Sequence, residues 1–185
     1  AYGHLQRAVE GQVDHLLAIG VPDLRLARLP GRYAELVDAV GAFDPRLSAA
    51  IPRVTEMCEE LASFGIAETL QHDDLHDGQV FVDAGHYRII DWGDAVVSHP
   101  FCTLSVTLEG VIQWGLDDVE GSVDTAPFQD VYLHAFGSPQ SLARAAALAT
   151  RLGWAARAVA THAAGGEEPE RIRTRLRMFL DGRPL

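Results

Sequence analysis

The chain has 185 residues, 48% of them apolar, so it can bury a core and is not a mainly disordered protein. Its 26 acidic residues outnumber its 15 basic residues, and the net charge of -11 excludes a protein that wraps nucleic acid phosphates. No apolar run reaches the roughly 18–20 residues of a membrane span, and none resembles a signal peptide. We expect one cytoplasmic domain that binds neither nucleic acid nor membranes. The oligomeric state cannot be read from this sequence.

Every basic residue is an arginine, and lysine is absent. The two cysteines, Cys58 and Cys102, lack the spacing of a zinc site or a redox pair, which favours a reduced protein. Cys58 lies on an apolar helical stripe, so we interpret it as a small core residue.

Apolar residues recur at helical spacing through the N-terminal part of the chain, where three helices are predicted. The first covers 5–17 and is stopped before Pro22. The second covers 33–40 and the third 47–61, in which Pro52 marks either a kink or a new first turn.

Two short β-prone runs follow, Val80–Val82 and Tyr87–Ile90, separated by a turn that contains glycine. This pattern predicts a β-hairpin. We therefore expect a mainly α fold with a small β-hairpin.

The segments after the hairpin are helical again. Apolar stripes predict helices over 101–111 and 128–136. Ser138 and Pro139 are typical of a helix start and open an alanine-rich helix that Gly153 can divide. The last helix is expected to turn three apolar residues inward: Ile172, Leu176 and Phe179.

The polar segment 70–79 runs directly into the first hairpin strand. A hairpin brings its two ends together, so Asp74 and Gln79 should lie near Asp91. Carboxylates beside an amide oxygen suit Mg²⁺, and a carboxylate free of metal can orient a hydroxyl for attack on phosphorus. Three further aspartates are interpreted as turn and cap residues: Asp73, Asp77 and Asp94.

The sequence His72-x-Asp74-x-x-x-x-Gln79, followed by Ile90-Asp91-Trp92-Gly93-Asp94, resembles the aminoglycoside phosphotransferase family, which has a protein-kinase-like fold. That family typically reads H-G-D-L-H-P-G-N, then a strand pair, I-D-W-G-D and a helix-opening H-P, which is here His99-Pro100. The resemblance implies a C-terminal lobe with a catalytic loop at 70–79 and a metal-binding loop at 89–94.

The resemblance also implies roles for single residues. Asp74 would be the catalytic aspartate that faces the acceptor hydroxyl. Asp91 and Gln79 would hold the Mg²⁺ that bridges the phosphates of ATP or GTP. His72 and His76 would support the catalytic loop. The acceptor would be a small molecule with a hydroxyl group, and the acidic net charge is compatible with a cationic one.

The chain departs from the family pattern in several places. Gln79 replaces an asparagine, Asp77 replaces a proline, and Thr103 stands where the family often has an aspartate. The family's β-rich N-terminal lobe, with its phosphate-pairing lysine, has no counterpart in the helical, lysine-free residues 1–71. We therefore expect that the N-terminal nucleotide lobe is absent from this chain and that the chain alone is inactive.

Two other interpretations stay open. A non-catalytic kinase-like binding module is favoured by Gln79 and Thr103. A metal-dependent hydrolase would use four ligands: His72, Asp74, His76 and Asp91. The hydrolase lacks a further histidine at a zinc spacing. A cation-binding pocket is conceivable at a second segment, although a solvated acidic turn is the simpler interpretation of its residues: Trp114, Asp117, Asp118 and Glu120.

Overall fold

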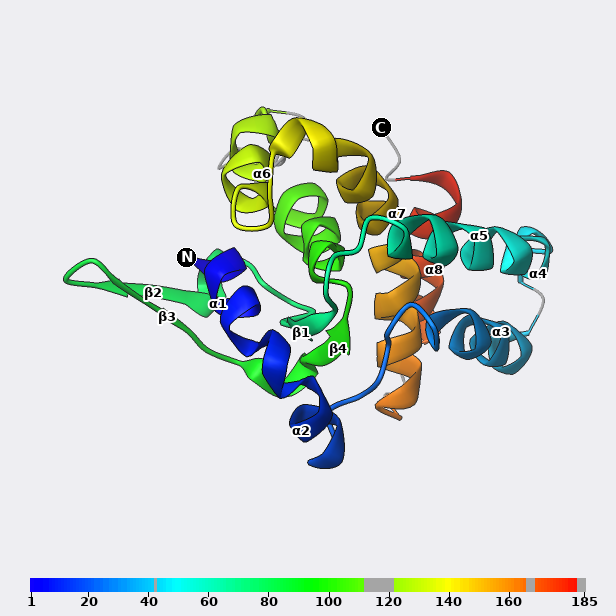
Figure 1. The fold of residues 1–185 in the computed structure, drawn as a ribbon. Coiled ribbons are helices and arrows are strands. Elements are labelled where there is room, and N and C mark those ends of the chain that lie inside the picture. Colours follow the sequence, from blue (N-terminus) through cyan, green and yellow to red (C-terminus); the bar gives the residue numbers. More distant parts are fainter. Residues whose placement is uncertain (42, 112–121, 166–168, 183–185) are drawn as a thin grey trace.

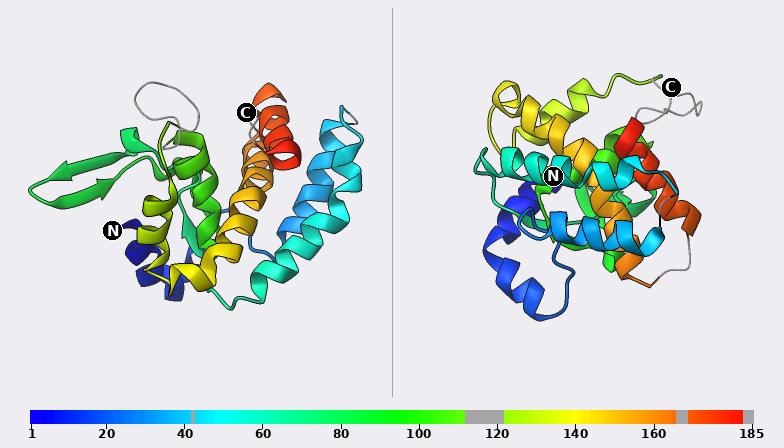
Figure 2. Two further views of the ribbon diagram at one scale, coloured as in Figure 1. Left: turned by 90° about the horizontal axis from the view of Figure 1, so that it is seen from above. Right: turned by 90° about the vertical axis from the view of Figure 1, so that its right-hand side faces the viewer.

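A computed structural model describes residues 1–41, 43–111, 122–165 and 169–182. In these parts the chain is mostly helical, and its strands form two antiparallel sheets of two strands each. Figure 1 shows the helices gathered around a long central helix, α7 (Pro139–Ala163). The β-hairpin projects from this helical body in Figure 1 and in the left view of Figure 2. The expected mainly α fold with a small hairpin is confirmed.

The N-terminal segment consists of three short helical pieces: α1 (Tyr2–Val9), a 3-10 turn (Glu10–Gln12) and α2 (Val13–Ala18). The single helix predicted here is therefore interrupted, and its apolar stripe is only half-buried. The buried residues of α1 are Gly3 and Gln6. The Gln6 side-chain amide donates to the carbonyls of Leu70 and Pro100 at 3.2 and 3.4 Å. A buried polar side chain thus attaches α1 to the body.

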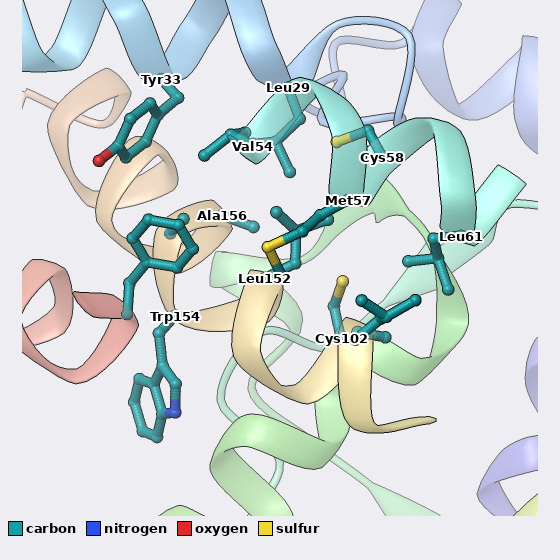
Figure 3. Packing of buried hydrophobic residues seen from close by; sticks show 14 of the residues in the cluster. Leu29, Tyr33, Val54, Met57, Cys58, Leu61, Cys102, Leu152, Trp154 and Ala156 are labelled. Atoms are coloured by element: carbon teal, nitrogen blue, oxygen red, sulfur yellow. The ribbon is translucent and has the colours of Figure 1, made fainter. Parts of the chain in front are cut away.

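The next helices are α3 (Leu29–Val40), α4 (Arg46–Ala49) and α5 (Ile51–Ala62). Pro52 lies in the first turn of α5, so it marks a new helix start and not a kink. Cys58 is buried, as expected, and burial raises the pKa of its thiol to about 12. In Figure 3, Leu29 and Val54 belong to the same apolar cluster as Leu152 of α7. The core therefore lies between α7 and the pair formed by α3 and α5.

The predicted hairpin consists of β2 (Val80–Asp83) and β3 (His86–Ile89). Its turn residues, Ala84 and Gly85, both have positive φ angles of 47° and 81°, as a two-residue hairpin turn requires. A second sheet pairs β1 (Thr69–Gln71) with β4 (Val96–Ser98), which was not predicted. It joins the start of the catalytic loop to the segment that follows the metal-binding loop.

The chain after β4 forms a 3-10 turn (Pro100–Thr103), a π-helix (Ser105–Val111), α6 (Ala126–Leu133), α7 and α8 (Pro169–Asp181). Two residues of the predicted α6 stripe, Phe128 and Val131, are 49% and 74% exposed because α6 is buried through Leu133 instead. The expected inward residues of α8 are all buried. No helix in the described parts has both the length and the apolarity to cross a bilayer.

Gly153 does not divide α7, which is continuous over its 25 residues. A Cβ atom at this position would lie 2.6 Å from the carbonyl oxygen of Cys102 and 2.6 Å from the Ser105 hydroxyl. Only a residue without a side chain allows the helix backbone to pass so close to the chain after β4. The glycine is therefore explained by packing.

Replacing Gly153 by alanine should lower the free energy of unfolding by roughly 1–3 kcal/mol, because the new methyl group meets backbone that cannot rotate away. Gly31 of α3 is the matched control, since a Cβ there meets nothing within 4 Å. Gly31→Ala should stabilise the chain by about 0.4–1 kcal/mol. Urea unfolding measures both. If both substitutions changed the free energy of unfolding equally, the close approach of Gly153 to Cys102 and Ser105 would be contradicted.

Candidate active site

His72 connects the two halves of the motif. Its ring is fully buried, and Nε2 lies 2.7 Å from the carbonyl oxygen of Ile90, the residue before Asp91. A carbonyl oxygen only accepts, so Nε2 carries the proton. The ring also packs edge-on against Trp92, with 4.8 Å between centroids. The His72 backbone N–H donates to the Tyr2 hydroxyl at 2.8 Å. The segment 70–79 is thereby fixed beside the segment 89–94.

Gln79 and Asp91 are brought together directly. The Gln79 amide Nε2 donates to Asp91 Oδ2 at 3.1 Å, and the Ile90 N–H donates to the Gln79 carbonyl at 3.0 Å. Gln79 is buried, whereas Asp91 is exposed and has left-handed backbone angles, with φ 60° and ψ 56°. Aspartate adopts this conformation more readily than most residues. Its carboxylate is presented to solvent at the end of the hairpin.

Asp74 is partly exposed and is held by an arginine of α7. Its Oδ1 accepts a hydrogen bond of 3.0 Å from Arg157 Nη2, and its Oδ2 lies 3.9 Å from His76 Nε2. Partial burial raises the pKa of the Asp74 carboxyl, but the hydrogen bond and the positive charge of Arg157 outweigh it. The pKa therefore lies below its ordinary value, and the carboxylate is ionised at neutral pH.

Asp73 lies in a bend, but it is not simply the turn residue that we inferred from the sequence. Its side chain is buried, with Oδ2 3.9 Å from Arg157 Nη1 and Oδ1 3.4 Å from the Gln71 amide. Burial raises the pKa of Asp73 to about 7, although Arg157 opposes this change. Asp77, whose side chain is 94% exposed, and the exposed Asp94 do lie in 3-10 turns, as expected.

His76 shapes the turn that carries Gln79. Its Nδ1 accepts from the Gly78 N–H at 3.1 Å and so caps the short 3-10 turn. Thr103 is buried and stands 3.5 Å from the Thr107 hydroxyl, which in turn donates to the Leu75 carbonyl at 2.9 Å. Through the bond to Leu75, these hydroxyl groups support the segment 70–79.

Arg157 is the residue of this site that the motif could not identify. Its side chain is only 6% exposed, and it contacts both aspartates of the catalytic loop. It is the one charged residue in the otherwise apolar stretch Trp154–Ala160. A lone arginine in such a stretch is a sign of a buried ion pair, although the sequence does not show its partner.

Residues 4–148 match the phosphotransferase enzyme family. The chain belongs to this family. The match includes Asp74, Gln79 and Asp91, and it ends before Arg157. The resemblance to the aminoglycoside phosphotransferase family is confirmed at this level. Neither the curated proteins nor the solved structures contain a match to this phosphotransferase chain.

A cavity of about 430 Å³ opens beside Asp74 of this phosphotransferase. Its lining includes Asp74, Asp94, Arg157, Arg171, Thr174 and Arg175. A second cavity of about 240 Å³ shares Asp94, Arg171 and Arg175 with the first. The acidic segment that was considered as a cation-binding pocket, with Trp114, Asp117, Asp118 and Glu120, lies outside the described residues.

The donor atoms fit Mg²⁺ better than zinc. Across residues 1–41, 43–111, 122–165 and 169–182, no three His, Cys, Asp or Glu side chains form a possible metal site. In addition, Nε2 of His72 is engaged by a carbonyl, which does not support the hydrolase interpretation. Mg²⁺ needs only one or two protein oxygens because it keeps waters and takes phosphate oxygens. The exposed Asp91 carboxylate can supply one such oxygen, whereas the Gln79 amide turns its nitrogen toward Asp91 Oδ2.

The raised pKa of Asp73 leads to a test by unfolding. Between pH 4 and 7 the folded chain retains a proton that an unfolded aspartate has released, so the free energy of unfolding falls as pH rises through this range. Asp73→Asn removes this contribution. The variant should therefore gain stability relative to wild type on going from pH 5 to pH 8, measured by urea unfolding.

Asp77→Asn is the control, because that side chain is exposed. Its stability relative to wild type should be the same at both pH values. An identical pH dependence for the two variants would show that Asp73 is ionised in the folded chain as it is in water.

Proposed function

We propose that this chain is the catalytic and acceptor-binding lobe of a protein-kinase-like phosphotransferase, which moves the γ-phosphate of ATP or GTP to a hydroxyl of a small molecule. The observation that carries the proposal is the connection between the motif halves. The His72–Ile90 bond and the Gln79–Asp91 bond hold the catalytic loop against the metal-binding loop.

In this proposal Asp74 faces the acceptor. Its ionised carboxylate accepts the hydroxyl proton while the acceptor oxygen bonds to the γ-phosphorus and the bond to the β-phosphate oxygen breaks. Arg157 fixes the carboxylate in position. Asp91 and Gln79 would hold Mg²⁺, which offsets the negative charge of the nucleotide phosphates when bound. His72 and His76 keep the loop in shape.

We further propose that the nucleotide-binding lobe lies outside these 185 residues. The projecting hairpin supports this, because it exposes apolar side chains on both faces: Phe81, Val82, Tyr87 and Ile90 are 44–63% exposed. An isolated two-stranded hairpin is only marginally stable in water, so a covering surface would stabilise it. A second lobe packed on the hairpin would provide that surface, and the chain alone would then be inactive.

Asp74→Asn tests the assigned proton acceptor. In the full-length protein it should lower the turnover of phosphate transfer by roughly 10²–10⁴-fold, the usual contribution of a positioned acid or base. Nucleotide affinity should change little, because the carboxylate faces the acceptor. Asp77→Asn, three residues further along and exposed, should leave turnover unchanged. Near-normal turnover in Asp74→Asn would show that another group accepts the hydroxyl proton.

The metal ligands are tested by the Mg²⁺ dependence of turnover. Asp91→Ala should abolish activity, since it removes the charged oxygen. Gln79→Asn should retain or improve activity, because it restores the side chain of the family pattern.

The non-catalytic alternative is favoured by one observation, the hydrogen bond in which Gln79 already pairs with Asp91. If that pair serves only to join the loops, wild type and both variants should show no Mg²⁺-dependent phosphate transfer. The same titration therefore separates the enzyme from the binding module.

A further inference from the structure

The cavity beside Asp74 is lined by three arginines against two aspartates, Asp74 and Asp94, although the chain as a whole is strongly acidic, with a net charge of -11. Arg157 comes from α7, and Arg171 and Arg175 come from α8. The cavity volume of about 430 Å³ is in the range that holds a small molecule. This local reversal of charge needs a physical explanation.

Arg157 has more hydrogen-bond donors than the described residues use. Its side chain is 6% exposed, and of its five N–H groups the bond to Asp74 accounts for one. Its Nε and Nη1 atoms are buried and have no hydrogen-bond partner in the described parts of the chain. The contact of Nη1 with Asp73, at 3.9 Å, is too long for a hydrogen bond. An unpaired buried donor is costly, so an acceptor that reaches these atoms after a small shift of the side chain would be favourable.

Arg175 adds a second guanidinium next to the first. One of its nitrogens, Nη1, donates to the Arg157 carbonyl at 3.1 Å and to the Thr161 hydroxyl, which anchors the side chain on α7. Burial and the charge of Arg157 lower the pKa of Arg175 to about 10, while Asp73 and Asp74 act in the opposite direction. Arg175 is thus a largely buried cation beside the cavity, and a bound anion would favour its charged form.

The motif does not account for these arginines. The family match ends at residue 148, whereas Arg157 and Arg175 lie beyond it. In the proposed function they lie where an acceptor would meet Asp74.

We propose that Arg157 and Arg175 bind an acidic group, a carboxylate or a phosphate monoester, on the same small molecule whose hydroxyl faces Asp74. The proposal rests on the proposed function and specifies its substrate class. Two planar guanidinium groups provide parallel donors that match the two oxygens of such a group. An acidic acceptor differs from the cationic acceptor that we expected from the net charge alone.

The test measures binding to the full-length protein without nucleotide. The probes are 4-hydroxybutyrate, 2-hydroxyethyl phosphate, the neutral butane-1,4-diol and the cationic 4-amino-1-butanol. NMR titration of the arginine Nε–Hε signals reports their affinities. One or both acidic probes should bind at least about tenfold more tightly than the diol and the amine, and should shift the signals of Arg157 and Arg175. The tighter acid identifies the group as carboxylate or phosphate.

Arg175→Gln should weaken binding of the preferred acid about tenfold and leave the diol unchanged. Arg175→Lys, which keeps the charge but loses the planar donors, should lie between Arg175→Gln and wild type. Arg144→Gln is the matched control, because this exposed arginine of α7 pairs with Glu60 on the surface. It should bind the acid as wild type does. Thermal unfolding checks that every variant is folded.

Equal affinity for acidic and neutral probes would overturn the proposal, as would an equal loss in Arg144→Gln and Arg175→Gln. Competition between ATP and the hydroxy acid for the same arginine signals would also overturn it, by assigning these side chains to the nucleotide. Failure of the proposed function has a different outcome, since the acid would then bind the chain while the full-length protein transfers no phosphate.

Discussion

A buried guanidinium among carboxylates is the constraint on which this site depends. Removing an arginine from water is costly unless its charge is paired, so Arg157 must stay close to the ionised Asp74. Because Arg157 belongs to α7, and α7 packs on α3, α5 and α8, the position of the catalytic loop is tied to the helical core. The core thus determines where the Asp74 carboxylate lies, and the loop does not have to hold it alone.

The second half of the site is positioned by backbone pairing. The β1–β4 ladder joins the chain before the catalytic loop to the chain after the metal-binding loop, and His72 connects the two loops between them. The β1–β4 ladder and the His72 ring therefore hold the two ends of the hairpin segment together. His72 and Ile90, which are 18 positions apart in sequence, are held together without a disulfide or a large sheet.

Local patterns could be predicted from the sequence, and long-range pairings could not. The hairpin was predictable because Ala84-Gly85 provides the turn, and the start of α7 because Ser138 and Pro139 mark it. The β1–β4 sheet has strands of three residues, too short for a periodic pattern. Asp73 was assigned to a turn because its partner Arg157 lies more than eighty residues away. Helix periodicity likewise cannot tell which apolar face meets the core, as the exposed Phe128 shows.

The close approach at Gly153 has a consequence for motion. Side chains between two packed elements can change rotamer and let the elements slide, but a carbonyl oxygen pressed against a helix backbone leaves no such freedom. The middle of α7 and the turn around Cys102 therefore form one rigid body. Slow conformational fluctuations should be concentrated elsewhere, in the projecting hairpin, whose apolar side chains are exposed. Amide hydrogens near Gly153 would exchange with solvent only when the whole domain unfolds.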